Sequence, residues 1–150
     1  MVHAGMVHAL EEIHRLLKPD GCLIDIHPFI GEFIEVHQGR KITFAEAVPA
    51  FNDEDIRQAE DALARVVQRQ LFLIERAAPF DFLIYASSVV ELRAYFDEAN
   101  AFDESSRDEM AAAWVLELAP RVEEAMRAAG EGAEVVYHEK AKISRMKPRR

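Results

Sequence analysis

The chain has 150 residues, of which half are apolar and 30% are charged, so composition predicts one folded globular domain spanning residues 1–150. The formal net charge of −9 argues against a nucleic-acid-binding protein, because contacts to phosphates need clustered Lys and Arg. The single cysteine, Cys22, excludes an intramolecular disulfide and a thiolate metal cluster. No apolar run approaches the length of a membrane span and no signal-peptide pattern is found, so we expect a cytoplasmic protein without membrane contact.

The first segment of the chain predicts a helix, a turn and a strand. Apolar residues recur at helical spacing from about Met6 to Leu17, and the following Lys18–Gly21 segment stops the helix. The run Cys22–Ile26 is apolar and bounded by turn signals, which predicts a strand buried on both faces with a structural thiol at its start. We expect the dipeptide His27-Pro28 to end this strand.

The middle of the chain predicts a β-hairpin and a long helix. Two β-prone runs, Phe33–His37 and Arg40–Phe44, are separated by a turn that contains Gly39, which is typical of a hairpin. Asn52 or Asp53 can cap a helix that we expect to run to about Arg76.

The last third of the chain predicts two more strands and two more helices. Phe80–Tyr85 is a strand, and the capping-box spacing of Ser88–Glu91 begins a helix that turns Leu92, Tyr95 and Phe96 inward. A second capping box, Ser106–Glu109, begins a helix with Trp114 in the core and a kink or break near Glu117, because Pro120 falls inside it. Gly130 and Gly132 end this helix, and Glu134–Met146 is a long final strand. Strands interleaved with helices predict an α/β or α+β domain.

The segment Ala9–Ile24 resembles a late motif of class I S-adenosylmethionine-dependent methyltransferases. In that family a helix ends in a Leu-Lys-Pro-Gly-Gly-like turn that enters the fifth strand, and here Asp20 replaces the first Gly. The Phe80 strand with its following helix resembles the sixth strand of the family, and the Glu134 strand resembles its final antiparallel strand. The resemblance implies the C-terminal half of a Rossmann-like methyltransferase sheet, with an inserted hairpin at Phe33–Phe44.

The resemblance also implies that the chain holds no cofactor by itself. Members of the family bind the cofactor on a Gly-rich turn after the first strand and hold its ribose with an acidic residue after the second. The sequence contains no Gly-x-Gly-x-Gly turn and no segments that match the first four strands of the family. S-adenosylmethionine is therefore expected only if a partner chain or an oligomer completes the site, and whether the protein is an enzyme stays open.

The missing neighbour of the fifth strand has a consequence for association. In the family this strand pairs with the fourth, so Cys22–Ile26 would expose an apolar edge here. An uncovered edge promotes aggregation, and a two-fold dimer is the simplest cover. We therefore predict a homodimer that forms through the Cys22–Ile26 edge or through the Phe33–Phe44 hairpin.

Polar residues gather just after the predicted fifth strand, where open α/β sheets present ligands. These are His27, Glu32, Glu35 and His37, which read either as substrate-contacting or general-base residues or as a solvated hairpin; their spacing does not favour a metal site. Asp25 lies within the apolar strand and must be hydrogen-bonded or face an opening, as a functional acid or a structural group. The candidate substrate-binding residues are Asp25, His27, Glu32 and His37, with no catalytic residue, cofactor-binding residue or metal ligand assigned.

Three functions fit these observations. The first is a methyltransferase-like protein without its own cofactor site, acting as a binding or accessory module or persisting as a remnant. The second is an active methyltransferase that a partner chain or an oligomer completes. The third is an α+β domain that binds a small molecule and shares only a coincidental likeness with the family.

Overall fold

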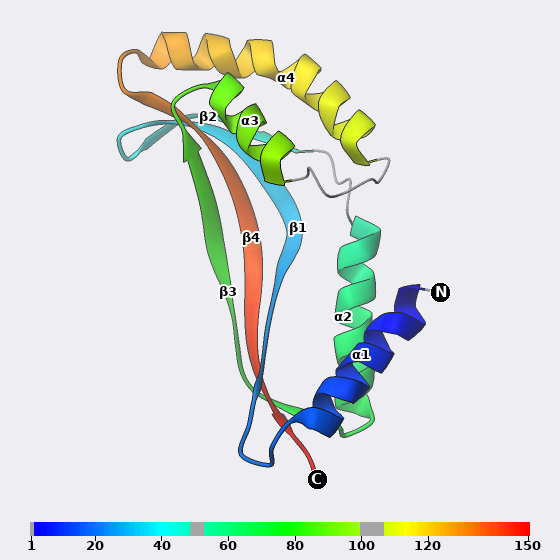
Figure 1. Ribbon diagram of the computed structural model, residues 1–150. Coiled ribbons are helices and arrows are strands. Elements are labelled where there is room, and N and C mark those ends of the chain that lie inside the picture. The colour runs from blue at the N-terminus through cyan, green and yellow to red at the C-terminus, as the bar shows by residue number, and fades with distance from the viewer. Residues whose placement is uncertain (1, 49–52, 100–106) are drawn as a thin grey trace. The chain divides into compact units, whose positions relative to one another are not determined.

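The computed structural model describes residues 2–48, 53–99 and 107–150, in which helices and strands are mixed along the chain (Figure 1). The elements in chain order are α1 (Val2–Leu16), β1 (Leu23–Gln38), β2 (Lys41–Ala47), α2 (Asp53–Gln68), β3 (Phe72–Ala86), α3 (Val89–Ala99), α4 (Arg107–Ala129) and β4 (Ala133–Pro148).

The strands form one sheet in the order β2-β1-β4-β3. β1 and β2 are an antiparallel hairpin whose register joins Gln38 to Lys41 and Phe33 to Ala47, with a bulge beside His37. Gly39, in the turn, has a φ of 60°, a left-handed conformation that glycine adopts without steric cost. β4 runs opposite to its neighbours β1 and β3 (Figure 1). The predicted α+β class and the predicted hairpin are confirmed.

The chain divides into two compact units that share the three long strands. Unit 1 consists of Met1–Ile30, Asn52–Asp81 and Lys140–Arg150, and unit 2 consists of Gly31–Phe51 and Phe82–Glu139. Each unit has its own hydrophobic cluster.

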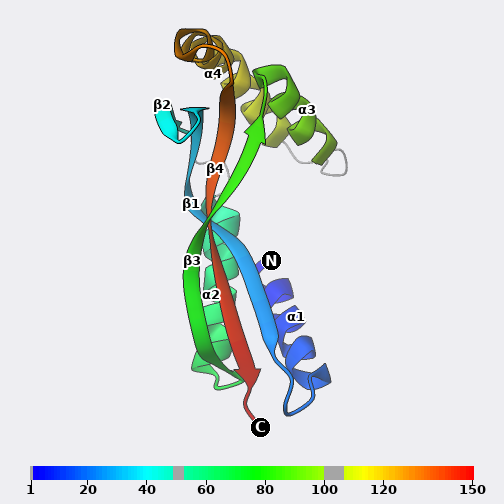
Figure 2. The ribbon, with the colours of Figure 1, turned by 90° about the vertical axis from the view of Figure 1, so that its left-hand side faces the viewer.

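In unit 1, helices α1 and α2 lie on one face of the strands (Figures 1 and 2). The apolar stripe predicted for the first helix enters this core, where Val7 is buried and Leu10 and Ile13 pack against it. The buried members of the cluster are Val7, Ala62, Val66, Phe72 and Met146.

The predicted end of the long helix near Arg76 is wrong, because α2 ends at Gln68 and β3 begins at Phe72. The N–H of Gln70 donates to the Val67 carbonyl at 2.9 Å, and the N–H of Leu71 donates to the Val66 carbonyl at 3.0 Å. This pair of bonds is a Schellman motif, and Gln70 takes the left-handed conformation that it requires, with a φ of 61°. The apolar residues after Gln70 therefore belong to a strand.

The predicted end of the first strand at His27-Pro28 and its predicted burial on both faces are also wrong. β1 begins at Leu23, after a half-buried Cys22, and continues through His27-Pro28 to Gln38. Its first part is covered on one face only: Ile24 is 49% exposed and Ile26 is 60% exposed. The reason is that both helices of unit 1 lie on the opposite face, toward which Leu23 and His27 point.

In unit 2, α3 and α4 pack against the strands through a cluster that includes Ile34, Val36, Leu118, Val122 and Val135. Helix α3 begins as its capping box predicts, because the Ser88 hydroxyl accepts the N–H of Glu91 at 3.0 Å. The Glu91 carboxylate accepts the N–H of Ser87, and hydrogen bonds from Ser87 lower the pKa of Glu91. Leu92 and Phe96 point inward as predicted, whereas Tyr95 is 46% exposed and its predicted burial is wrong.

Helix α4 runs from Arg107 to Ala129 with Pro120 inside it, so a break near Glu117 does not occur, and of the two predicted alternatives only a kink stays a prediction. Leu118 and Val122 on either side of Pro120 are both buried in the core and hold the helix there. Gly130, with a φ of 94°, ends the helix, and β4 extends slightly beyond the predicted final strand. Ser106 and the side chain of Trp114 lie outside the described residues.

Candidate functional site

Unit 1 contains a cluster of one imidazole and two carboxylates. β1 places Asp25 and His27 on the same face of the sheet, since residues two apart in a strand point the same way. His27 Nδ1 lies 2.6 Å from Asp25 Oδ2, and Glu60, on α2, places its Oε1 3.5 Å from His27 Nε2. The His27 and Asp25 side chains are 10% and 20% exposed, whereas Glu60 is 41% exposed.

This geometry is that of an oriented imidazole. A carboxylate beside Nδ1 accepts the Nδ1–H of His27 and so leaves the lone pair on Nε2, which is the arrangement of a general base. The half-exposed Glu60 carboxylate lies 3.5 Å from Nε2, which is too far for a strong hydrogen bond. The cluster therefore holds one imidazole in a defined orientation with its Nε2 near a second carboxylate.

Unit 2 contains the converse arrangement, one carboxylate between two imidazoles. His37 Nε2 donates to Glu35 Oε2 at 2.6 Å, and His138 Nδ1, from β4, donates to Glu35 Oε1 at 2.8 Å. Glu35 and His37 are both buried. Burial raises the pKa of Glu35, but the hydrogen bonds and charges of His138 and His37 outweigh it, so the pKa lies below 4.5.

Aromatic rings frame the unit 2 cluster. Ile34 and Val36 face the core under α3 and α4, so the alternate residues Glu35 and His37 point to the other face of the sheet. The His37 ring meets Tyr85 edge-on at 5.7 Å between centroids, a contact that spans β4, and Phe33 lies 6.3 Å from the His138 ring. Both Glu35 oxygens are thus bonded within a packed setting, which fixes the geometry of the cluster.

Glu32 lies in the same unit near a second carboxylate. Burial and the charge of Glu32 together raise the pKa of Glu139 above 4.5. Two nearby acids of this kind disfavour each other's ionised form.

The structure divides the predicted site residues between the two units. Asp25 and His27 are brought together in unit 1, while His37 and Glu32 lie in unit 2 with different partners. Sequence reasoning did not select Glu60 or His138. The sequence pattern could have indicated Glu60, which lies four residues after the buried Ile56 and so falls on the same face of the helix. It could also have indicated His138, because the alternation of the final strand assigns each of its residues to one face of the sheet.

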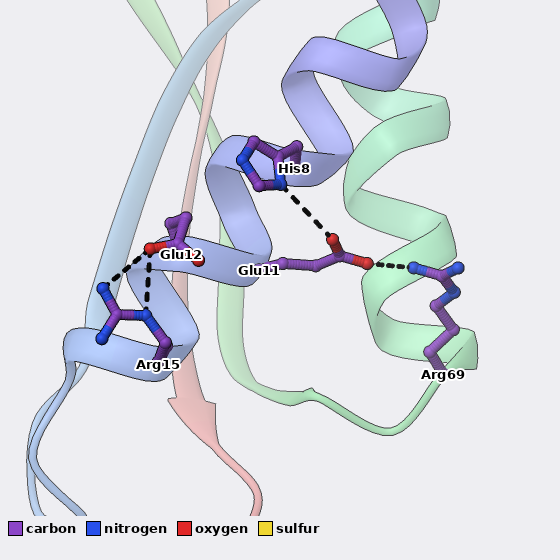
Figure 3. A network of polar contacts seen from close by, with 5 residues as sticks. All are labelled: His8, Glu11, Glu12, Arg15 and Arg69. Carbon is purple, nitrogen blue, oxygen red and sulfur yellow. Dashed lines mark hydrogen bonds and ion pairs between the residues drawn. The ribbon is translucent and has the colours of Figure 1, made fainter.

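Within the described ranges, no group of three or more His, Cys, Asp or Glu side chains has a geometry that could hold a metal ion. The described helices include none that is long and apolar enough to cross a membrane. A further polar network on α1 is a surface feature (Figure 3): Glu11 forms an ion pair with Arg69, in the turn that follows α2, and Glu12 pairs with Arg15 at 2.8 Å. These exposed ion pairs join α1 to that turn or to itself and form no enclosed site.

Searches for a matching protein family, a similar curated protein and a similar solved structure each found no match.

Proposed function

We propose that this chain is a methyltransferase-related accessory module that binds a partner chain and does not hold S-adenosylmethionine by itself. The observation that carries the proposal is the place of the last strand. β4 lies between β1 and β3 and runs opposite to both, while β1 and β3 run in the same direction with α2 between them in the chain (Figure 1). The methyltransferase resemblance implies this succession: a fifth strand, a helix, a sixth strand and a final antiparallel strand.

The turn that carries the sequence resemblance supports the same proposal. After α1, the N–H of Gly21 donates to the Lys18 carbonyl at 2.9 Å, which closes a tight turn before β1. A Cβ added at Gly21 would lie 3.1 Å from the Lys18 carbonyl oxygen and 3.2 Å from a methyl carbon of Leu17. A side chain at position 21 would therefore crowd the turn, which gives the Leu-Lys-Pro-Asp-Gly motif a physical reason.

Association is part of the proposal. Among the described residues, no strand pairs with the outer side of the first half of β1, and this part of β1 exposes Ile24 and Ile26. A homodimer through the Cys22–Ile26 edge or through the β1–β2 hairpin would cover apolar surface of this kind.

Isothermal titration calorimetry of the purified chain with S-adenosylmethionine and with S-adenosylhomocysteine tests the proposal. We expect no saturable heat and no rise in the melting temperature at millimolar ligand, because a ligand that binds the folded state raises its stability. Saturable binding with a micromolar dissociation constant by the chain alone would contradict it.

A second candidate function is a methyltransferase that a partner completes, and the pair Asp25–His27 favours it. In such an enzyme His27 Nε2 would take the proton that the methyl acceptor loses, and Asp25 would keep the imidazole in the required tautomer. Glu60 would stand beside the protonated ring.

Long-range ¹H–¹⁵N spectra of the imidazoles show which ring nitrogen of His27 carries the proton, and so test whether Nε2 is available as the general base of this second candidate. The Nδ1–H tautomer is expected for neutral His27 in the wild-type chain, with a shift toward Nε2–H in Asp25→Asn. His37, which donates from Nε2 to Glu35, is the internal control and should keep its tautomer in the variant. An Nε2–H tautomer of wild-type His27 would remove it as a base at that atom.

A further inference from the structure

The first half of β1 is an open edge of the sheet in unit 1. Among the described residues, β2 pairs with β1 from Phe33 to Gln38, and the N–H of Val48 donates to the Glu32 carbonyl beyond that register. Among the described residues of unit 1, β1 is the outermost strand, next to β4 and then β3 (Figure 2). The segment Leu23–Ile30 therefore presents backbone N–H and C=O groups to which another strand can bond.

The side chains beside this edge are exposed and apolar. Ile24 and Ile26 lie on the face of unit 1 that the helices leave uncovered, together with Leu73 of β3 and Ile143 of β4, which are also exposed. On the same face, Glu75 pairs with Arg145 at 3.1 Å and with Lys147 at 3.2 Å. The surface thus carries both signs of charge around an apolar centre, so it does not repel a copy of itself.

The opposite edge of the sheet is protected in the usual ways. In unit 1, β3 carries the charged residues Glu75, Arg76 and Asp81, which discourage pairing with another strand. The corresponding stretch of β1 has five residues before Pro28, of which only Asp25 is an acid. Of the two edges in unit 1, β1 is therefore the one suited to accept a strand.

We propose that a second copy of this chain pairs with the Leu23–Phe29 edge, antiparallel and two-fold symmetric about Ile26. This inference rests on the proposed function, since it names the partner of a binding module. In this register Ile26 faces its own copy, Asp25 of one copy faces His27 of the other, and Leu23 faces Phe29. Asp25 and His27 already pair within each copy, so this register opposes no like charges, and its apolar residues match across the axis, as an isologous interface requires.

The neighbouring possibilities are less favourable. A register centred on Asp25 places two carboxylates directly opposite each other, which destabilises a strand pair. The hairpin is a poorer surface for a second copy because its outer strand, β2, contacts α4: Arg121 of α4 forms an ion pair with Glu46 of β2 at 2.6 Å. Each copy has a net charge of −9, so association depends on a segment, such as this one, where charge is low or paired.

Sedimentation velocity of the full chain tests the interface with two matched variants. Ile26→Lys places two cations at the symmetry axis, and we expect dimerisation to weaken roughly 100-fold or more, since two buried isoleucines are lost as well. Ile42→Lys, at an isoleucine of similar exposure on the hairpin, should leave the dimer unchanged. Neither residue belongs to a core cluster, so both variants should fold, and circular dichroism is the check on this.

A wild-type chain that is monomeric at micromolar concentration, or a dimer that survives Ile26→Lys, would overturn the inference. Loss of the dimer in Ile42→Lys alone would assign the interface to the hairpin and overturn it equally. These results are independent of calorimetry with S-adenosylmethionine: cofactor binding by a dimeric chain would overturn the proposed function and leave the interface intact.

The register has its own test, Ile26→Cys in a Cys22→Ser background. Mild oxidation should link nearly all chains into a disulfide dimer, because the introduced thiols face each other across the axis. Ile42→Cys in the same background is the matched control and should stay unlinked. Equal cross-linking of the two variants would contradict the register about Ile26.

Discussion

Unit 1 holds one imidazole between two carboxylates, whereas unit 2 holds one carboxylate between two imidazoles. The residue types are the same, but their use differs. In unit 2 both oxygens of the buried Glu35 accept short hydrogen bonds, so the group is fixed and stabilises the fold. In unit 1 His27 has one short bond to Asp25, and its other nitrogen faces a more exposed Glu60 at 3.5 Å.

The two clusters differ in what the second candidate function could use. Glu35 is buried with both oxygens hydrogen-bonded, whereas His27 is an oriented imidazole with a long contact on its second nitrogen. We therefore assign a stabilising role to Glu35 with its histidines, and reserve the chemical role for Asp25 with His27. The following changes test that assignment.

Glu35→Gln should have the largest effect, a loss of about 3 kcal/mol in the free energy of unfolding at neutral pH, because it leaves buried imidazole donors poorly paired. Urea denaturation measures it. Glu134→Gln, an exposed acid on β4 in the same unit, is the control and should change the free energy by less than about 0.5 kcal/mol. A loss as small as that of the control would show that the unit 2 cluster does not stabilise the fold.

The contribution of Glu35 should also depend on pH. Its pKa in the folded protein lies below 4.5, so its stabilisation is present above about pH 4.5 and is lost as the pH falls through the folded pKa. The difference in unfolding free energy between wild type and Glu35→Gln should therefore shrink as the pH falls below about 4.5. A difference that keeps growing below that pH would contradict the sign of the shift.

Asp25→Asn should lower the free energy of unfolding by less than Glu35→Gln does, by about 1 kcal/mol, because it removes one hydrogen bond to a neutral imidazole in a less enclosed cluster. The same urea measurement compares it with Glu35→Gln. A loss equal to or larger than that of Glu35→Gln would reverse the assignment of roles to the two clusters.

Glu139→Gln should have the smallest effect and the opposite sign, a gain of roughly 0.5 kcal/mol at neutral pH. Burial and Glu32 raise the pKa of Glu139, so its ionised form costs stability as the pH rises from 4.5 through the folded pKa. The advantage of the variant should therefore vanish on acidification. Glu32→Gln relieves the same repulsion, and the double variant should gain less than the sum of the two.

Local signals predicted local features of this fold. The hairpin at Gly39, the cap at Ser88 and the end of α4 at Gly130 each depend on a few adjacent residues, and each was predicted. The end of α2 was not predicted, because the apolar residues after Gln70 fit the apolar stripe of a helix as well as a strand. Packing against the core around Val66 decides between the two structures.

The candidate site was predictable only within one strand. Asp25 and His27 are two residues apart on β1, so their contact follows from strand geometry. Glu60 joins them from 33 residues away, and His138 joins Glu35 from 103 residues away. Such contacts depend on which helix covers which face and on strand order, which periodicity does not specify.

Amide NMR of the full chain titrated with S-adenosylhomocysteine tests the central proposal most directly, that of a methyltransferase-related module without its own cofactor site. We expect the spectrum to stay unchanged up to millimolar ligand, including the amides of Lys18 to Gly21 and of the first half of β1. Saturable shifts at those amides with a micromolar dissociation constant would contradict the proposal.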